Sequence, residues 1–459
     1  MNRFLLSAAH KSSGKTTLSI GIVAALRARG RRVQAFKKGP DYIDPLWLGT
    51  ASGRACHNLD FHTQTDAELV DYFTAHASDA DIALIEGNMG LFDSIDLEGH
   101  GSNAALAALL DTPIILVLDV QGMTRSVIPV IQGYLNFDPN IRIAGLIFNR
   151  VGGERHAARL REVVAHYLDL PIVGMVHRDA RLNIDEKHLG LVPSNESPEA
   201  RAKVSRIAEI IASQIDLDAL EEIAATSAPL IAVPAEGGIR APDVRIGIPR
   251  DEAFAFYYAS DLEALRKAGA DLVFFDALRD TALPCVDGLF LGGGFPERHM
   301  QELTDNTAMR IAIRQAIDAG LPCYAECGGL MYLSRAIIWD DQRADMVGVI
   351  PADVTMHRRP VGRGYTELEQ TADAPWPNLE TARFPAHEFH YSSLNPIDGA
   401  PRYAYKVLRG SGIDGRHDGY LYRNLLASYT HLRDVHGNRW AGRFVEFVRR
   451  HKNADASKV

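Results

Sequence analysis

The sequence predicts an α/β protein with two domains, and three observations support that fold class. The chain has 459 residues, 46% of them hydrophobic, which suffices for two cores of ordinary size. From residue 1 to 215, short apolar runs alternate with helical stretches, as in a parallel sheet wrapped by helices. A second α/β series starts at residue 244. We therefore expect domains at 1–215 and 244–459, joined by a linker at 216–243.

Each strand expected in the first domain is a run of apolar or β-branched residues that ends at small or polar residues. Ligands of such sheets bind at the carboxyl ends of the strands, so functional residues are expected in the loops that follow them. The expected strands are FLLSAA (4–9), RVQAF (32–36), DIALIEG (81–87), PIILVLDV (113–120), IAGLIFN (143–149) and PIVGMV (171–176), with helices over 15–29, 102–110 and 155–168.

The linker is expected where the amphipathic period ends. Residues 216–243 read DLDALEEIAATSAPLIAVPAEGGIRAPD, a mixture of acidic residues, Ala, Pro and Gly. The second series then runs through VRIGIP (244–249), DLVFF (271–275), GLFLGGG (288–294) and LPCYAECGGLMYL (321–333). Shorter, turn-rich segments follow.

Composition excludes several classes of partner. The net charge of −9 leaves no basic field that would attract nucleic acid or an anionic membrane surface. The four cysteines, Cys56, Cys285, Cys323 and Cys327, lack the paired spacing of a zinc site or a disulfide framework. The apolar stretch at the N-terminus is too short for a signal peptide, and no apolar run is long enough to span a membrane. We expect a soluble, cytoplasmic protein.

The stretch AHKSSGKTT (9–17) is typical of a phosphate-binding loop, although Ala9 stands where the GxxxxGK[ST] pattern has glycine. Backbone N–H groups of small residues at a helix N-terminus can bind an anion. Lys15 would then reach the terminal phosphates and Thr16 would hold Mg²⁺. The alternative is a plain strand-to-helix turn. The expected nucleotide-binding residues are Ser12, Ser13, Gly14, Lys15, Thr16 and Thr17.

Two acidic segments could complete a nucleotide and metal site. In ALIEGNMGLFD (83–93), Glu86 ends an apolar strand and Asp93 lies in the following glycine-containing loop. In FKKGPDYIDP (36–45), Asp41 and Asp44 lie between two prolines that stiffen the loop. Such acids can bind metal and orient a second substrate. The alternatives are a helix cap or a solvated loop acid for Glu86, and a Pro-Asp turn for the second segment.

The motifs SSGKTT, KKGPDYIDP and EGNMGLFD, in this order, resemble the amidoligase domain of the cobyrinic acid a,c-diamide synthase family, which is grouped with dethiobiotin synthetase among P-loop-type ATPases. The resemblance implies metal binding and catalysis by Asp41, Asp44, Glu86 and Asp93, with Thr16, Asp44 and Glu86 as metal ligands. It also implies substrate selection by Tyr42 and Ile43, although many members have leucine at the position of Ile43. Asn149 resembles the asparagine that reads the nucleotide base, or it is a turn former.

A second site is indicated by AECGGLMYL (325–333), where a strand, a sharp turn and a helix follow one another with Cys327 at the turn. A thiol at a helix N-terminus favours the nucleophilic thiolate. Cys323, inside the strand, is better explained as a small buried hydrophobic residue. His431 in LASYTHLRDVHG (426–437) is the expected base, with His436 as a rival. The glycines of GLFLGGG (288–294) could offer backbone N–H groups as an oxyanion hole.

These elements resemble a class I glutamine amidotransferase domain of the cobyrinic and cobyric acid synthase branch. The resemblance implies that His431 raises the nucleophilicity of Cys327. Members often have a second histidine at the position of Arg433, and no residue of the sequence is assigned as the acid of a catalytic triad.

Two further segments leave alternatives open. His387, Glu388 and His390 in FPAHEFHYS (384–392) could bind metal, or have a structural or substrate-contacting role in an extended segment. In MHRRPVGRGYTEL (356–368), the arginines could lie in a solvated loop or bind a polycarboxylate substrate. These arginines are Arg358, Arg359 and Arg363.

The resemblance implies ATP- and glutamine-dependent amidation of the a and c acetate carboxylates of a tetrapyrrole, with Mg²⁺. Cobyrinic or hydrogenobyrinic acid is the expected substrate, and sirohydrochlorin, its nickel form and sirohaem are alternatives. A homodimer is compatible with these features. A regulatory or partitioning P-loop ATPase is the alternative from another class, but its signature lysine would stand at the position of His10, and it has no cysteine domain.

Overall fold

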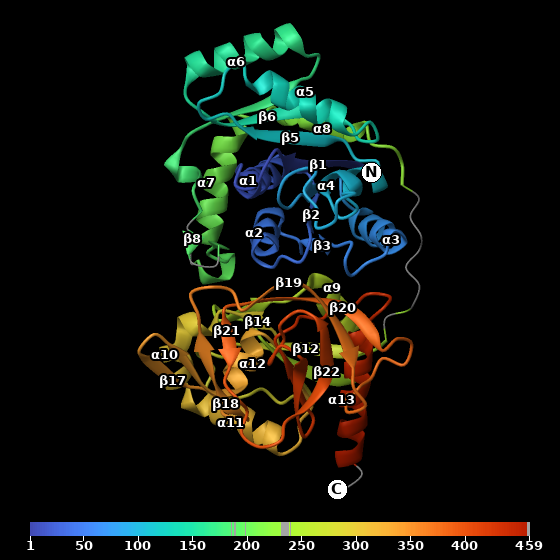
Figure 1. Cartoon of the computed structure of the whole chain (residues 1–459), viewed down its shortest axis with the longest axis vertical. Helices are drawn as coiled ribbons and strands as arrows, with labels where there is room; N and C mark the ends of the chain where they lie inside the picture. The colour runs from blue at the N-terminus through green and yellow to red at the C-terminus, as the bar shows by residue number, and fades with distance from the viewer. Residues whose placement is uncertain (185, 188–189, 198, 231–237, 239, 457–459) are drawn as a thin grey trace. The chain divides into compact units, whose positions relative to one another are not determined.

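The computed structural model describes residues 1–184, 186–187, 190–197, 199–230, 238 and 240–456. The chain divides into two compact units, Met1–Ala235 and Glu236–Val459 (Figure 1). Each contains its own sheet and its own hydrophobic cores. The predicted α/β class is confirmed for both.

The first unit is built on a seven-stranded sheet with the order β3-β2-β4-β1-β5-β6-β7, in which all described pairs are parallel. The elements of this unit are β1 (Asn2–Ala8), α1 (Lys15–Ala28), β2 (Val33–Lys38), α2 (Ile43–Ser52), β3 (His57–Leu59), α3 (Asp66–Ala77), β4 (Ile82–Glu86), α4 (Asn103–Leu109), β5 (Ile114–Asp119), α5 (Val127–Phe137), β6 (Ile143–Val151), α6 (Glu154–Tyr167), β7 (Ile172–His177), η1 (Ala180–Leu182), β8 (Glu186–Lys187), β9 (Gly190–Leu191), η2 (Ser194–Glu196), α7 (Ala200–Ala212) and α8 (Leu217–Ala225).

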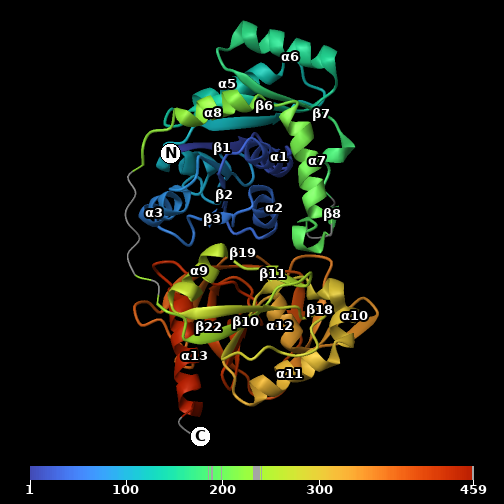
Figure 2. The same ribbon diagram turned by 180° about the vertical axis from the view of Figure 1, so that it is seen from behind.

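Helices cover both faces of this sheet. Successive residues of a strand face opposite sides, so Leu6 of β1 packs in the core with α1, α2, α7 and α8, whereas Leu5 packs in the core with α3, α4, α5 and α6. Figures 1 and 2 show α1 and α7 side by side. Their close approach depends on Gly21, because a Cβ there would lie 2.4 Å from Ile211 Cγ1.

Helix α2 begins inside the segment 36–45, for which a stiff loop was predicted. One carboxylate oxygen of Asp41 accepts hydrogen bonds from the backbone N–H groups of Ile43 (2.9 Å) and Asp44 (3.1 Å). These contacts satisfy two donors of the first turn, which otherwise have no partner within the helix. The helix therefore starts at Ile43 and carries Asp44 in its first turn.

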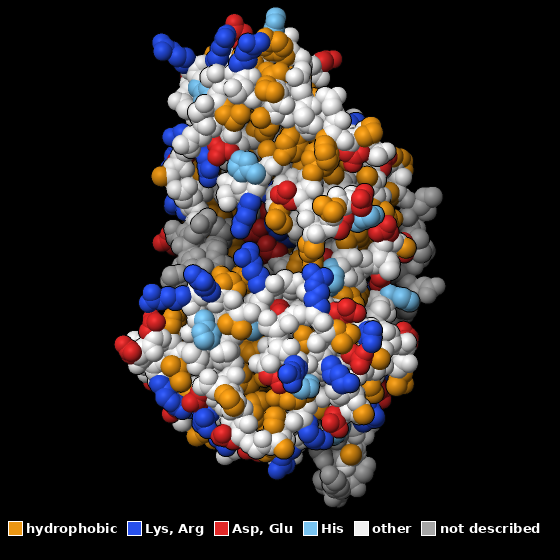
Figure 3. All heavy atoms as spheres, viewed as in Figure 1, with side chains coloured by type: hydrophobic (Ala, Val, Ile, Leu, Met, Phe, Trp, Pro, Cys, Tyr) orange, Lys and Arg blue, Asp and Glu red, His pale blue; other side chains and the backbone are white. Residues whose placement is uncertain are grey.

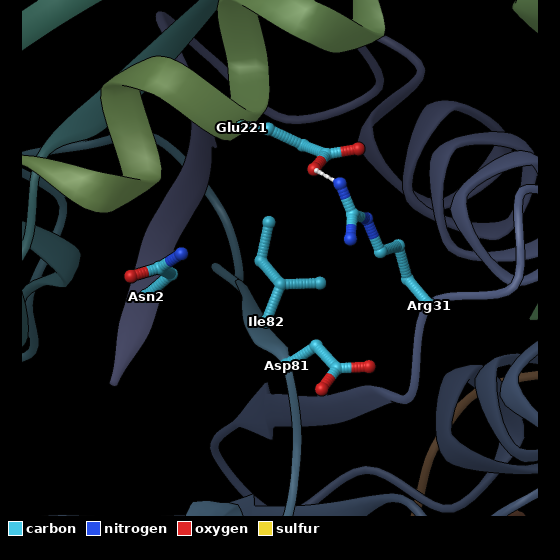
Figure 4. A pocket seen from close by; sticks show the side chains of 5 residues that line it. All are labelled: Asn2, Arg31, Asp81, Ile82 and Glu221. Atoms are coloured by element: carbon cyan, nitrogen blue, oxygen red, sulfur yellow. Dashed lines mark ion pairs between the residues drawn. The ribbon is translucent and has the colours of Figure 1, made fainter.

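The segment predicted as a linker contains a packed helix. Within 216–243, helix α8 buries Leu217, Leu220 and Ala224 against the first sheet. Its exposed side forms an ion pair between Glu221 and Arg31 (2.6 Å), beside a pocket at the amino ends of β1 and β4 (Figure 4). Leu217, Leu220, Ile223 and Ala224 give this helix an amphipathic pattern, but the Pro- and Gly-containing residues that follow it led to its assignment to the linker. Residues 231–237 and 239 of the predicted linker lie outside the described residues.

The second unit contains a nine-stranded sheet with the order β12-β10-β13-β15-β24-β23-β22-β19-β20. It is parallel from β12 to β24 and antiparallel from β24 to β20. The elements of this unit are β10 (Val244–Pro249), β11 (Phe254–Phe256), α9 (Ala259–Lys267), β12 (Ala270–Phe275), β13 (Gly288–Leu291), β14 (Gly293–Gly294), η3 (Pro296–His299), α10 (Met300–Asp305), α11 (Thr307–Asp318), β15 (Cys323–Glu326), α12 (Gly328–Leu333), β16 (Ser334–Trp339), β17 (Gln342–Asp345), β18 (Ile350–Met356), β19 (Gly362–Gln370), β20 (Arg383–His390), β21 (Ser392–Leu394), β22 (Arg402–Arg409), β23 (His417–Tyr422), β24 (Leu425–Ser428) and α13 (Trp440–Ala456).

This sheet is also covered on both faces, which fixes the direction of the side chains in β15. Tyr324 packs in the core with α9 and α13, whereas its neighbours Cys323 and Ala325 pack in the core with α10, α11 and α12. Cys323 is fully buried there, in agreement with its interpretation as a small hydrophobic residue.

The surface carries charges of both signs. On the face drawn in Figure 3, acidic and basic side chains occur together on each unit. Within the described residues, no helix combines the length and the apolar character required to cross a bilayer.

Because α8 packs on β1 and β7, Leu220→Ala should raise the hydrogen-exchange rates of these elements. Removal of this fully buried side chain should lower the free energy of unfolding of the first unit by about 2–5 kcal/mol. Glu222→Ala on the exposed side of the same helix is the matched control, with an expected change within about 0.5 kcal/mol. Hydrogen-exchange mass spectrometry of peptides from β1 and α8 compares the two variants. Equal exchange in both variants would contradict the assignment of α8 to this core.

Candidate functional site

Three loops of the first unit meet at one edge of its sheet. Strands β2, β4 and β1 are neighbours and run parallel, so the loops that follow them leave from the same edge. These loops are 9–14 after β1, 39–42 after β2 and 87–93 after β4. They carry the residues for which the sequence predicts nucleotide and metal binding.

The loop 9–14 ends at Gly14, where the backbone conformation and the surrounding space admit only glycine. Gly14 has φ +91°, and a Cβ there would lie 2.2 Å from the Nδ2 atom of Asn149. That amide donates a hydrogen bond to the Ser13 carbonyl (2.8 Å), so the end of β6 holds the loop in place. The Asn149 side chain, which was predicted to read a nucleotide base, therefore contacts the predicted phosphate-binding loop itself. Thr17 follows, half-buried, in the first turn of α1.

Thr16, Asp44 and Glu86 form a cluster around one buried lysine. The Oγ1 atom of Thr16 lies 2.8 Å from Glu86 Oε1 and 3.1 Å from Asp44 Oδ2. Lys37 donates to Glu86 Oε1 (2.7 Å) and also to Asp44. The sequence analysis missed Lys37, although its position at the end of the second strand was a usable signal.

The charges in this cluster shift one another's protonation. Burial raises the pKa of Asp41 to about 7, and repulsion from Asp44 adds to the rise. Burial also raises the pKa of Glu86, against the attraction of Lys37. For Asp44, burial acts to raise the pKa, but the Lys37 ammonium and the hydrogen bonds from Lys37 and Thr16 together lower it. Burial, followed by repulsion from Lys37, lowers the pKa of Lys15 to about 8.

The donor atoms fit a hard divalent cation. Hydroxyl and carboxylate oxygens of Thr16, Asp44 and Glu86 are the ligand type that Mg²⁺ prefers. The Oε2 atom of Glu86 is buried and accepts no hydrogen bond within the described part of the chain. Asp41, Asp44 and Glu86 all form ion pairs with the Lys37 ammonium, and a divalent cation would add further positive charge where these three carboxyl groups repel one another.

Asp93, Tyr42 and Ile43 lie beside this cluster in different ways. Asp93 accepts a hydrogen bond from the Gly90 N–H (2.8 Å) and so fixes the loop 87–93, whose Met89 carbonyl accepts from Lys15. Tyr42 directly precedes α2 and is half-buried. Ile43 packs against the core under α2. The structure thus brings together Thr16, Asp44 and Glu86, and the Asp93 carboxylate attracts Lys15 less strongly than Glu86 and Asp44 do.

In the second unit, Cys327 lies at a tight turn between β15 and α12. Its backbone has φ +46° and ψ −100°, a conformation that side-chain-bearing residues rarely adopt. Both following glycines are required by space: a Cβ on Gly328 would lie 2.9 Å from Gly294 N, and one on Gly329 would lie 2.2 Å from the Leu291 carbonyl oxygen. This is the strained strand-to-helix geometry that exposes a nucleophile in hydrolases.

His431 reaches this turn from the neighbouring strand. β24 runs parallel to β15 with Ser428 opposite Glu326, and the Cys327 N–H donates to the Ser428 carbonyl (2.7 Å). His431 follows three residues later and is 2% exposed, whereas the rival His436 is exposed. The geometry therefore favours His431 as the base beside Cys327. Its Nδ1 atom lies 3.2 Å from the Oε2 atom of Glu326.

Burial decides the protonation of Cys327. It raises the pKa of the thiol well above the ordinary value, and the Glu297 carboxylate adds to this rise. The prediction that the helix N-terminus favours the thiolate is therefore wrong for this structure, because α12 spans only Gly328–Leu333 and its effect is outweighed by desolvation. A base must remove the proton before the sulfur can attack.

The glycines proposed for an oxyanion hole are only partly available. The N–H of Gly292 donates to the Tyr257 hydroxyl (3.1 Å). Gly293 and Gly294 form β14, and a Cβ on Gly293 would lie 2.7 Å from Cε1 of His431. The remaining candidates for stabilising an oxyanion are thus the backbone N–H groups of Gly293 and Gly294.

The segment FPAHEFHYS lies largely on strand β20, so its histidines do not converge. His387 stacks on His431, with ring centres 4.8 Å apart, and His390 stacks on Tyr429 at 4.0 Å. Glu388 accepts hydrogen bonds from the N–H groups of Ser411 and Gly412. Within the described residues these three side chains form no group of metal ligands. The structural alternative is therefore favoured over metal binding.

The arginine-rich segment is exposed and lies near the same strand. Arg358 and Arg359 lie on the exposed connection between β18 and β19. The Arg363 guanidinium lies 5.8 Å from the ring centre of Phe389, whose carbonyl oxygen is 3.9 Å from the Cys327 sulfur. The arginines are thus free to contact a solute that approaches this face.

Comparisons with known proteins match both units. The profile of CobQ/CobB/MinD/ParA nucleotide binding domains matches residues 7–192, and that of CobB/CobQ-like glutamine amidotransferase domains matches residues 245–436. A cobyrinate a,c-diamide synthase of Magnetococcus marinus is 46% identical over 97% of each chain. The chain belongs to the cobyrinate a,c-diamide synthase family. Enzymes of the same name from Methanosarcina acetivorans (40% identical, 97% of this chain and 95% of the other) and Listeria monocytogenes serotype 4b (38%, 94% and 96%) are also similar.

Family membership confirms the predicted resemblance and the reaction class. The chain is a glutamine-dependent amidating ligase with a nucleotide-binding domain and a glutamine amidotransferase domain. The match of residues 245–436 to a glutamine amidotransferase domain contradicts the alternative from another class, a regulatory or partitioning ATPase without a cysteine domain.

Gly14→Ala should weaken the binding of a nucleoside triphosphate by more than about tenfold, because the added methyl group strains the backbone and meets Asn149. Gly30→Ala is the matched control: Gly30 follows the same helix with φ +84°, but a Cβ there meets no atom within 4 Å. Isothermal titration of both variants with a non-hydrolysable ATP analogue measures the difference. Equal affinities would show that the loop 9–14 does not bind the nucleotide.

Proposed function

We propose that this chain converts the a and c acetate carboxylates of cobyrinic or hydrogenobyrinic acid to amides, with ATP and glutamine as cosubstrates. The observation that carries the proposal is the pairing of two distinct sites in one chain. The Cys327 turn beside His431 is suited to releasing ammonia, and the loop 9–14 beside Asp44 and Glu86 is suited to activating a carboxylate. The similar enzymes of Magnetococcus marinus and Methanosarcina acetivorans are cobyrinate a,c-diamide synthases, which supports this substrate over sirohydrochlorin, its nickel form or sirohaem.

In the glutaminase half-reaction, His431 takes the proton of the buried Cys327 thiol, and the sulfur attacks the side-chain amide of glutamine. The tetrahedral oxyanion is stabilised by backbone N–H groups near Gly293 and Gly294. Protonated His431 then gives its proton to the leaving nitrogen, so that ammonia departs and a thioester remains. Water hydrolyses the thioester to glutamate and restores the thiol.

In the ligase half-reaction, an acetate oxygen of the macrocycle attacks the γ-phosphorus of ATP, forming an acyl phosphate and ADP. Ammonia then attacks the carbonyl carbon and phosphate leaves, which yields the amide. The backbone N–H groups of Ser12, Ser13 and Gly14 and the Lys15 ammonium bind the phosphates, and Lys37 balances the acids at the transferring group. Thr17 completes the first turn and Asn149 holds the loop.

The Thr16 hydroxyl and the Asp44 and Glu86 carboxylates would hold Mg²⁺, which supplies charge neutralisation of the phosphate oxygens when bound. In this proposal Asp41 positions the first turn of α2, and Asp93 positions the loop that contacts Lys15.

Substrate selection is assigned to side chains next to the acids. Tyr42 and Ile43 lie between Asp41 and Asp44 in the chain, so a change in their shape alters how the macrocycle carboxylate meets the γ-phosphate. Arg358, Arg359 and Arg363 are assigned to the other carboxylates of the substrate, because a guanidinium binds a carboxylate with two hydrogen bonds. The proposal also includes a cytoplasmic location and a homodimeric assembly.

Cys327→Ala should abolish glutamine-dependent amidation and keep amidation with added ammonium, because only the release of ammonia requires the thiol. Mass spectrometry of the products, with cobyrinic acid, sirohydrochlorin and sirohaem supplied in parallel, measures both the activity and the substrate. Cys323→Ala is the matched control and should keep both activities. Loss of the ammonium-dependent reaction in a folded Cys327→Ala protein would contradict the division of labour, and amidation of sirohaem alone would contradict the substrate.

Glu86→Gln should reduce ATP-dependent amidation by about a hundredfold or more and raise the Mg²⁺ concentration needed for half-maximal rate, because one ligand charge is lost. Glutamate release from glutamine should persist. Steady-state assays over a magnesium titration test this expectation, with the exposed Glu98→Gln as control. An unchanged magnesium requirement would remove Glu86 from the metal site.

A further inference from the structure

We infer that Glu326 is the positioning acid of the glutaminase site, holding His431 in the orientation and tautomer in which it can accept the Cys327 proton. This inference rests on the proposed roles of Cys327 and His431. The sequence left the acid of a triad unassigned, and the position two residues after His431 is occupied by a cation, Arg433.

The Glu326 carboxylate contacts both the ring and the backbone of the histidine segment. Its Oε2 atom lies 3.2 Å from Nδ1 of His431, and its Oε1 atom accepts the Leu432 N–H at 2.9 Å. The Tyr324 hydroxyl also donates to Oε1. The side chains of Glu326 and His431 are each 3% exposed. At this burial a carboxylate with several donors is held firmly, because each unmade hydrogen bond would cost free energy.

Sheet topology explains why this residue can act from an unusual place in the sequence. Glu326 is the last residue of β15 and directly precedes Cys327. β24 is the parallel neighbour of β15, and the chain leaves β24 at Ser428 to reach His431. One strand end therefore supplies both the nucleophile and the acid, and the adjacent strand end supplies the base.

The contact defines the tautomer of His431. A carboxylate at Nδ1 accepts a hydrogen bond from the N–H of that nitrogen, so Nε2 is the unprotonated nitrogen that can take the proton of the thiol. The same carboxylate stabilises the imidazolium after transfer. A firmly oriented base matters here because the buried thiol is protonated at rest.

Other groups near His431 are oriented for other contacts. His387 stacks face to face on it, with an angle of 16° between the rings, so its nitrogens lie in a parallel plane. The Arg433 guanidinium lies over the Tyr258 ring at 5.1 Å. Asp418 accepts from the Thr430 N–H and hydroxyl, and Asp434 accepts from the Ala441 N–H.

The substitution Glu326→Gln tests the inference sharply. The Leu432 N–H can only donate, so an amide at position 326 would turn its oxygen toward Leu432 and its NH₂ group toward Nδ1 of His431. That arrangement favours the opposite tautomer, in which Nε2 carries the proton and cannot act as a base. We expect kcat for glutamate release to fall by about a hundredfold or more, with KM for glutamine little changed. Amidation driven by ammonium should stay close to the parent rate.

Two further variants accompany this one. Glu369→Gln removes a half-buried carboxylate of the same unit whose partners are the Arg383 and Lys406 side chains, so it should keep kcat for glutamate release within about threefold. Glu326→Asp keeps the charge but withdraws it by one methylene. It should give a kcat between those of Glu326→Gln and the parent, with a loss of about tenfold.

The outcomes separate the inference from the proposed function. A parent-like kcat for glutamate release in Glu326→Gln overturns the inference. If that variant does not fold, Glu326→Asp decides, and a parent-like kcat in it has the same consequence. Glutamate release that survives Cys327→Ala overturns the proposed glutaminase site instead. If Cys327→Ala loses glutamate release and Glu326→Gln keeps it, only the positioning role of Glu326 is overturned.

Discussion

Both candidate sites depend on one constraint, that adjacent parallel strands end at the same edge of a sheet. In the first unit β1, β2 and β4 bring Thr16, Lys37 and Glu86 together from segments far apart in the chain. In the second unit β15 and β24 bring the Cys327 turn next to the segment that carries His431. The hydrogen bonds of the sheets fix these strand ends, so the side chains start from a rigid backbone and lose little conformational entropy when they meet.

Electrostatics differ between the two sites because the chemistry differs. Around Lys37 several carboxylates are concentrated, and their repulsion is relieved by an ammonium and by a hydroxyl. Such a cluster is suited to polyphosphate and metal, whose charges complement it. Around Cys327 the groups are buried, and the Glu326 carboxylate is held by three donors. A buried site of this kind suits an amide substrate and a proton that moves over a short path.

The sequence predicted the elements and loops that carry chemistry, because strands, glycines and acidic residues leave local patterns. The loop at Gly14, the turn at Cys327 and the acids at Asp44 and Glu86 were all predicted in this way. Lys37 and Glu326 were missed, since their partners lie on other strands and a single sequence does not reveal which strands are neighbours. Helix α2 was missed because Pro45 was interpreted as stiffening a loop, although proline fits the first turn of a helix. Helix α8 was missed because it was grouped with the Pro- and Gly-containing residues that follow it.

The burial of the Cys327 sulfur has a consequence for the life of the protein between turnovers. Peroxides and other oxidants react with thiolates far faster than with thiols, so a nucleophile that stays protonated and largely excluded from solvent at rest is protected from sulfenic and sulfinic acid formation. Cys285, by contrast, is exposed. Oxidative damage should therefore collect on the exposed Cys285, while the sulfur proposed to form the thioester is spared.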